Sequence, residues 1–130
     1  MKTFAFPRKA RLKSQKAIDN LFGRVPHGMP STRISSCLCY PLRAVWTEPY
    51  QRTDSYNGTR ILISVPKKRL RHAVQRVTMR RRVREAWRLQ RHQGGDINLD
   101  IAFIYVANKV ENYSKVSNAI SKIIGKLHNN

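Results

Sequence analysis

The chain has 130 residues, 41% of them hydrophobic, and its 26 Lys and Arg against 7 Asp and Glu give a formal net charge of +19. This length suits one domain, residues 1–130, and the hydrophobic fraction excludes a wholly disordered basic tail. An excess of like charge costs stability through self-repulsion. We therefore expect a polyanionic partner, with nucleic acid favoured over an anionic membrane surface.

The N-terminal segment is basic, and residues 1–10 are expected to form a flexible basic N-terminus. No apolar run in the sequence approaches roughly 18 residues, so no membrane span and no membrane partner are expected. The first residues also lack the apolar stretch and the small-residue cleavage site of a signal peptide. We therefore expect a cytoplasmic protein.

The first expected element is a helix over residues 14–22, SQKAIDNLF. Ser14 is its candidate N-cap, and Gly23 is expected to end it. Four apolar residues recur at helical spacing and share one face: Ala17, Ile18, Leu21 and Phe22.

A strand is expected over residues 33–46, RISSCLCYPLRAVW, where Pro41 indicates an edge, a bulge or a break. Alternation predicts one face with Leu38 and Tyr40 and another with Cys37 and Cys39. The two cysteines are too close in an extended strand for an ordinary disulfide. The four histidines show no matching metal-ligand spacing, so we expect reduced thiols and no cysteine metal site.

Further elements alternate along the rest of the chain. Residues 47–59 are rich in turn formers, and a β-branched strand is expected over 60–66. A long helix over 70–92 is followed by a strand over 100–107. The last helix has an apolar face formed by Val116, Ala119, Ile120, Ile123, Ile124 and Leu127. The order of helix, two or three strands, helix, strand and helix predicts an α/β (α+β) sandwich on one small sheet.

The long helix combines an apolar stripe with a strongly basic surface. The stripe, expected to pack on the sheet, consists of Met79, Val83, Ala86 and Trp87. A row of arginines runs beside it, formed by Arg80, Arg84, Arg88 and Arg91 and flanked by Arg76 and Arg81. Glu85 is the only acid among residues 67–91, against eleven Lys and Arg, and is expected to pair with Arg81 or Arg88.

Three interpretations of this charge compete: a solvated helix face, a general nucleic-acid-binding surface, and a dedicated surface in a ribonucleoprotein. A helix face that is merely solvated would normally mix charge signs and form ion pairs at i,i+4 spacing. Arginine, by contrast, suits bidentate phosphate contacts and stacking on bases. We interpret the helix as a polyanion-binding element. The preceding loop adds Lys67, Lys68, Arg69 and Arg71 near a helix N-terminus, which favours phosphate, although an ordinary solvated loop is the alternative.

The sequence offers no candidate active site. The seven acids are scattered singly, whereas metal-dependent hydrolysis needs clustered carboxylates. Neither a Ser-His-Asp set nor a glycine-rich phosphate loop is present in the sequence. We expect no catalysis by the protein itself.

Four stretches together resemble the bacterial ribonuclease P protein family over nearly the whole chain: RLKSQKAIDNLF, ILISVPKK, AVQRVTMRRRVREAW and DIAFIYVA. The resemblance implies the order α-β-β-β-α-β-α, with a left-handed β-α-β crossover against the general right-handed preference. It also implies the protein subunit of an endoribonuclease that removes the 5′ leader of precursor tRNA. In that family the RNA subunit performs the hydrolysis with Mg²⁺, so no metal is expected on protein side chains and no DNA partner is expected.

The resemblance implies two RNA-facing surfaces. The residues expected to face the catalytic RNA subunit are Lys67, Lys68, Arg69, Arg71, Arg76, Arg80, Arg81, Arg84 and Arg88. Those expected to face the leader are Arg11, Ile18, Phe22 and Tyr40. Aromatic rings suit a single strand because they stack on bases with little sequence preference. For Phe22 and Tyr40 the alternative is ordinary core packing.

Two features depart from the family pattern. Val77 and Thr78 follow Arg76 where the family has Asn and Arg, so the hydrogen bonds of those two side chains cannot be copied. We hypothesise that residues 80–82 supply replacement charge. Ile18 stands where the family usually has an aromatic residue. The rival functions are a structural RNA-binding protein, such as a ribosomal protein, and a DNA-compacting basic protein.

Overall fold

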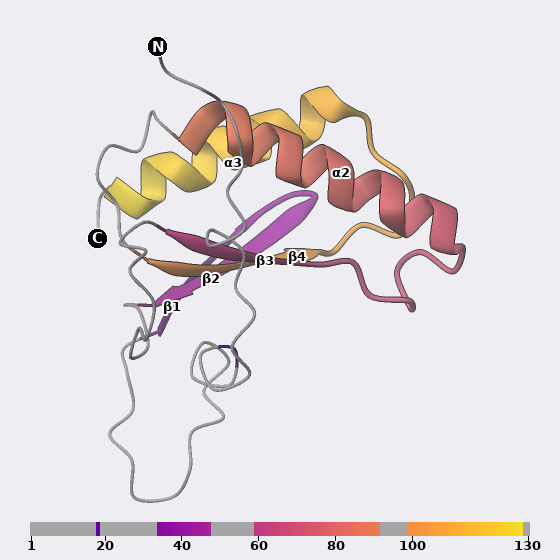
Figure 1. Cartoon of the computed structure of the whole chain (residues 1–130), viewed down its shortest axis with the longest axis horizontal. Coiled ribbons are helices and arrows are strands. Elements are labelled where there is room, and N and C mark those ends of the chain that lie inside the picture. Colours follow the sequence, from indigo (N-terminus) through magenta and orange to yellow (C-terminus); the bar gives the residue numbers. More distant parts are fainter. Residues whose placement is uncertain (1–17, 19–33, 48–58, 92–98, 129–130) are drawn as a thin grey trace, which may run out of the picture.

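The computed structural model describes residue 18 and residues 34–47, 59–91 and 99–128. Within these ranges one four-stranded sheet carries two long helices (Figure 1). The elements are β1 (Ile34–Cys39), β2 (Leu42–Thr47), β3 (Arg60–Ser64), α2 (Ala73–Gln90), β4 (Asp100–Tyr105) and α3 (Tyr113–His128). Ile18 has a helical conformation, where the first helix was expected, and the rest of residues 14–22 lies outside the described residues.

The segment predicted as one strand over 33–46 forms two strands. β1 and β2 pair antiparallel with Cys39 opposite Leu42, which leaves Tyr40 and Pro41 as the turn between them. Proline has no amide hydrogen to donate to a strand ladder, so the chain reverses at this point. Of the three alternatives for Pro41, the break is the one observed, and three strands precede α2.

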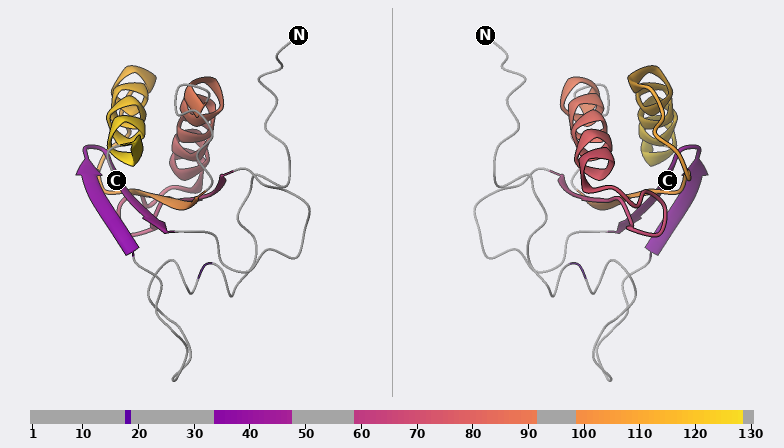
Figure 2. Two further views of the ribbon diagram at one scale, coloured as in Figure 1. Left: turned by 90° about the vertical axis from the view of Figure 1, so that its left-hand side faces the viewer. Right: turned by 90° about the vertical axis from the view of Figure 1, so that its right-hand side faces the viewer.

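β3, α2 and β4 form a parallel β-α-β unit. The sheet order is β1-β2-β4-β3, with β4 parallel to β3 and antiparallel to β2. Both helices cover the same face, with α2 toward β3 and α3 over β1 and β2 (Figure 2). Seen along β3 and β4 from their first residues, β3 lies to the right of β4 with α2 above them (Figure 2, left). The crossover is therefore left-handed, as the family resemblance implied.

The main core lies between the sheet and the two helices. The four residues of the predicted α2 stripe are all buried, and Trp87 packs on Phe103 of β4 with ring centroids 5.5 Å apart and planes tilted by 53°. All six residues predicted for the apolar face of α3 are buried as well. The helical period therefore identified both buried faces.

The helix and strand limits differ from the expected ones by at most three residues. α2 begins at Ala73 rather than at residue 70, because the amides of Arg69 and Leu70 donate to the Pro66 carbonyl at 3.0 and 3.3 Å and form a turn. β3 and β4 each end two residues earlier than expected. Residues 65–72 are thus a loop between β3 and α2.

The opposite face of the sheet carries a smaller cluster. Val45 and Ala102 are buried there, and Ile18 packs against them together with Leu62 and Ile104. At the start of β3 and β4, two residues before Leu62 and Ala102, Arg60 donates two hydrogen bonds to the Asp100 carboxylate, both 3.0 Å long. The Arg60 side chain is 9% exposed and that of Asp100 is 0% exposed, so this ion pair is a buried link between β3 and β4.

The cysteines of β1 lie on the α3 side of the sheet, where Cys39 is buried in the core and Cys37 packs against it. Burial raises the pKa of the Cys37 thiol to about 11, and the neighbouring Cys39 adds to the effect. The folded protein therefore holds little of the Cys37 thiolate at neutral pH. Because the thiolate is the reactive form, Cys37 is expected to react slowly.

We expect iodoacetamide to alkylate Cys37 at pH 8 at least about tenfold more slowly in the folded protein than in urea, measured by tandem mass spectrometry of the peptide that carries Cys37. The rate in the folded protein should rise with pH toward pH 11, because the raised pKa delays ionisation. Equal rates in folded and unfolded chains would contradict this account of the site.

Candidate nucleic-acid interface

The outer surface of α2 is basic and has no acid in the first turn of the helix. Arg81 is exposed, while Arg80, Arg84 and Arg88 are half-buried. The predicted arginine row thus borders the buried stripe of α2 and is partly covered. Val74 and Val77 are also exposed on this helix, at 78% and 38%, so apolar side chains interrupt the basic surface before Arg81.

The side chain of Arg76 turns back toward the loop before α2. One of its terminal nitrogens (Nη1) donates to the backbone carbonyls of Leu70 and Arg71, each at 2.9 Å. Arg76 therefore fastens the loop in front of α2, in addition to bringing charge to this end of the helix. The Thr78 hydroxyl donates to the Val74 carbonyl at 2.9 Å within the helix, so it does not replace an arginine.

The loop between β3 and α2 forms one wall of a basic hollow. Arg69 reaches across to Asn108, whose side-chain oxygen accepts a hydrogen bond of 3.2 Å. The hollow has a volume of about 470 Å³, and its lining includes Lys68, Arg69, Arg71, His72, Asn108 and Lys109. Lys67 lies beside it with Lys68, and both are exposed. The structure thus gathers the predicted basic loop with a second loop, residues 106–112, that sequence reasoning had not included.

Glu85 pairs with Arg88 rather than with Arg81. The Nε of Arg88 donates to a Glu85 carboxylate oxygen at 3.1 Å, and a second Arg88 nitrogen contacts the other oxygen. Hydrogen bonding to Arg88 lowers the pKa of Glu85, and the same contact raises the pKa of Arg88. The single acid of α2 therefore neutralises part of the charge at the C-terminal end and leaves the middle of the helix positive.

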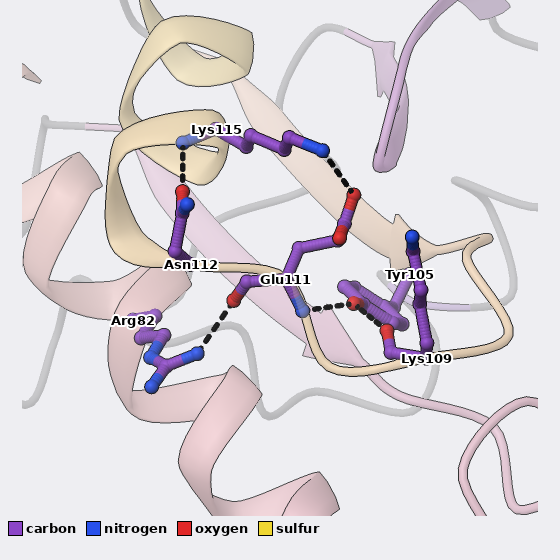
Figure 3. A network of polar contacts seen from close by, with 6 residues as sticks. All are labelled: Arg82, Tyr105, Lys109, Glu111, Asn112 and Lys115. Carbon is purple, nitrogen blue, oxygen red and sulfur yellow. Dashed lines mark hydrogen bonds and ion pairs between the residues drawn. The ribbon is translucent and has the colours of Figure 1, made fainter.

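The Arg82 side chain binds another part of this chain. Its guanidinium donates to the backbone carbonyl of Glu111 in the loop before α3 (Figure 3). In the same network the Tyr105 hydroxyl accepts the Glu111 amide at 3.1 Å and donates to the Lys109 carbonyl. Of the residues hypothesised to replace the missing family arginine, only Arg80 and Arg81 are left for this role.

The two candidate leader residues that the structure describes, Ile18 and Tyr40, are not packed together. Ile18 lies in the cluster on the face of the sheet opposite the helices, whereas Tyr40 lies in the turn after β1 and is not packed in that cluster. Tyr40 is 55% exposed, so the core alternative is wrong for it. Partial desolvation and the nearby Glu111 carboxylate raise the pKa of Tyr40. Arg11 and Phe22 lie outside the described residues.

Among residues 18, 34–47, 59–91 and 99–128, no three His, Cys, Asp or Glu side chains are close enough to hold a metal ion. In those same residues no helix has the length and apolar character needed to cross a bilayer.

Known proteins with similar sequence and structure point to one family. The family model described as Ribonuclease P matches residues 6–128. The ribonuclease P protein components of two Porphyromonas gingivalis strains, ATCC 33277 and W83, are each 31% identical over 98% of this chain and 90% of their own length.

Solved structures of the ribonuclease P proteins of Staphylococcus aureus and Thermotoga maritima show the same fold. Their TM-scores are 0.67 and 0.64, at 18% and 16% identity. These alignments cover 90% and 89% of this chain, and 94% and 96% of the other chains. The basic helix on a four-stranded sheet, the left-handed crossover and the match over 6–128 agree, and the chain belongs to the ribonuclease P protein family.

Proposed function

We propose that this chain is the accessory protein subunit of ribonuclease P, binding the catalytic RNA subunit and the 5′ leader of precursor tRNA. The observation that carries the proposal is the surface of α2. Its like charges destabilise the helix, since Glu85 is their only acidic neighbour in residues 67–91. A polyanion that neutralises them offsets this cost, and RNA is the polyanion associated with the family.

The two surfaces have separate roles in this proposal. α2 and the loop before it bind the RNA subunit through Lys67, Lys68, Arg69, Arg71, Arg76, Arg80, Arg81, Arg84 and Arg88. Arg76 acts partly by holding the loop, through its bonds to the Leu70 and Arg71 carbonyls. The single-stranded leader is held by Arg11, Ile18, Phe22 and Tyr40. The exposed ring of Tyr40 supports stacking on a base.

The reaction assisted is endonucleolytic removal of the leader in the cytoplasm during maturation of the tRNA 5′ end. Mg²⁺ bound by the RNA subunit supplies the hydrolytic chemistry, and the protein supplies charge and stacking surfaces. This division agrees with the scattered acids of the sequence, which offer no carboxylate cluster for a metal.

The decisive experiment measures cleavage of precursor tRNA by the cognate RNA subunit at low Mg²⁺, with and without the protein. We expect no cleavage by the protein alone and faster cleavage when it is added to the RNA, because phosphate repulsion is then screened by protein charge. A protein that binds the RNA but leaves the cleavage rate unchanged would instead be a structural RNA-binding protein. No binding at all would contradict both functions.

A further inference from the structure

A hollow between α2 and the start of α3 combines arginines with an aromatic ring. It has a volume of about 420 Å³ and is lined by Arg81, Arg82, Arg84, Glu85, Arg88 and Tyr113. Tyr113 is the first residue of α3 and is 36% exposed. Tyr113 lies outside the four stretches of the sequence that resemble the ribonuclease P protein family.

The polar network of Figure 3 fixes the chain just before Tyr113. Arg82 of α2 binds the Glu111 carbonyl, and the Tyr105 hydroxyl holds the Glu111 amide. The Asn112 side chain accepts the Lys115 amide at 3.0 Å, which ties the preceding residue to the first turn of α3. Glu111 is 4% exposed, so this anchor is buried. The position of Tyr113 beside α2 is therefore set before any ligand binds.

The chemistry of the lining indicates its ligand. Four arginines and one glutamate give the hollow a net positive charge, and Glu85 is already engaged by Arg88. Guanidinium groups bind phosphate in bidentate geometry. A tyrosine ring stacks on a nucleobase irrespective of its identity. Bases inside a duplex already stack on their neighbours, so only an unpaired base can stack on the Tyr113 ring.

We propose that Tyr113 and the arginines around it form a binding site for one unpaired nucleotide of the RNA subunit, with Arg81 and Arg84 on its phosphate and Tyr113 stacked on its base. This inference rests on the proposed function, and it extends the RNA-binding surface from α2 to α3. Arg82 is a positioning residue in this site, because its guanidinium is bound to Glu111.

The test is the affinity of the full-length protein for the cognate RNA subunit. Tyr113→Ala should weaken binding roughly 5- to 150-fold, because one base–aromatic stack is lost. Tyr113→Phe keeps the ring and should bind within about twofold of the parent, since stacking needs no hydroxyl. Leu89→Ala removes an exposed apolar side chain of α2 outside the hollow, and should leave affinity unchanged.

Fluorescence of a Tyr113→Trp variant gives a second readout that is independent of any loss of stability. Trp46 and Trp87 are only 5% and 3% exposed, so a new indole at the surface is distinguishable from them. Stacking on a base should quench its emission when the RNA subunit is added. The inference is overturned if Tyr113→Ala binds like the parent or if the emission of Tyr113→Trp does not change. If the parent protein still stimulates cleavage by the RNA subunit in that case, the proposed function stands.

Discussion

The double variant Arg80→Ala/Arg81→Ala is expected to bind the RNA subunit at least ~100-fold more weakly than the parent. Arg81 is exposed and Arg80 is half-buried on α2, next to the positions where Val77 and Thr78 replace the family's Asn and Arg. Hydrogen bonds to charged groups contribute about 1.5–3 kcal/mol each. Loss of one such contact at each of two sites therefore produces this change.

Salt dependence of the affinity separates phosphate contacts from other effects. The slope of log K against log salt should become shallower by about 0.7–0.9 for each phosphate contact removed. The matched control is Lys122→Ala/Lys126→Ala, which removes the same charge from exposed positions of α3. Its affinity should change much less. Unchanged binding by the Arg80/Arg81 variant would mean that these residues do not replace the missing family contacts.

Asp100→Ala should destabilise the fold by about 3–5 kcal/mol, because it leaves the buried Arg60 guanidinium without its carboxylate. Both hydrogen bonds of this pair are 3.0 Å long, and Asp100 is fully buried. Domains of this kind are stable by only about 5–15 kcal/mol, so the loss is a large part of the total. The measurement is urea-induced unfolding, followed by circular dichroism.

The control for Asp100 is a double substitution that removes both charges. Arg60→Met/Asp100→Leu should recover most of the stability lost in Asp100→Ala, because no charge is then buried alone. A single variant that unfolds at the same urea concentration as the parent would show that the ion pair is not needed to link β3 and β4. A double variant as unstable as the single one would instead indicate that packing, rather than charge, is lost.

The hydrophobic period of the sequence predicted which helix faces are buried. It could not predict where the helices and strands begin and end, because local turns set these limits. The stripe from Met79 to Trp87 follows from the helical repeat alone, because every member faces the same side. The start of α2 at Ala73 depends on the amides of Arg69 and Leu70, which bond to the Pro66 carbonyl and form a turn that the hydrophobic period does not reveal. The break at Pro41 was among the alternatives because proline removes a donor from the ladder.

The individual contacts of arginine were beyond sequence reasoning. Eleven Lys and Arg lie in residues 67–91, and a guanidinium can turn to any acceptor within its reach. Arg76 turns back to the loop and Arg82 turns to Glu111, 29 positions away in the chain. Arg60 and Asp100 meet only because β3 and β4 are in parallel register. Tyr113 was overlooked for the same reason, since its neighbours are on another helix.

The place of β4 in the sheet sets the order in which the molecule can be assembled. β4 is the last strand of the chain and yet lies between β2 and β3, so it pairs with both. Until residues 100–105 have been synthesised, the β1–β2 hairpin and the β3–α2 segment share no strand ladder. The sheet is therefore completed late during translation, by insertion of β4 between β2 and β3.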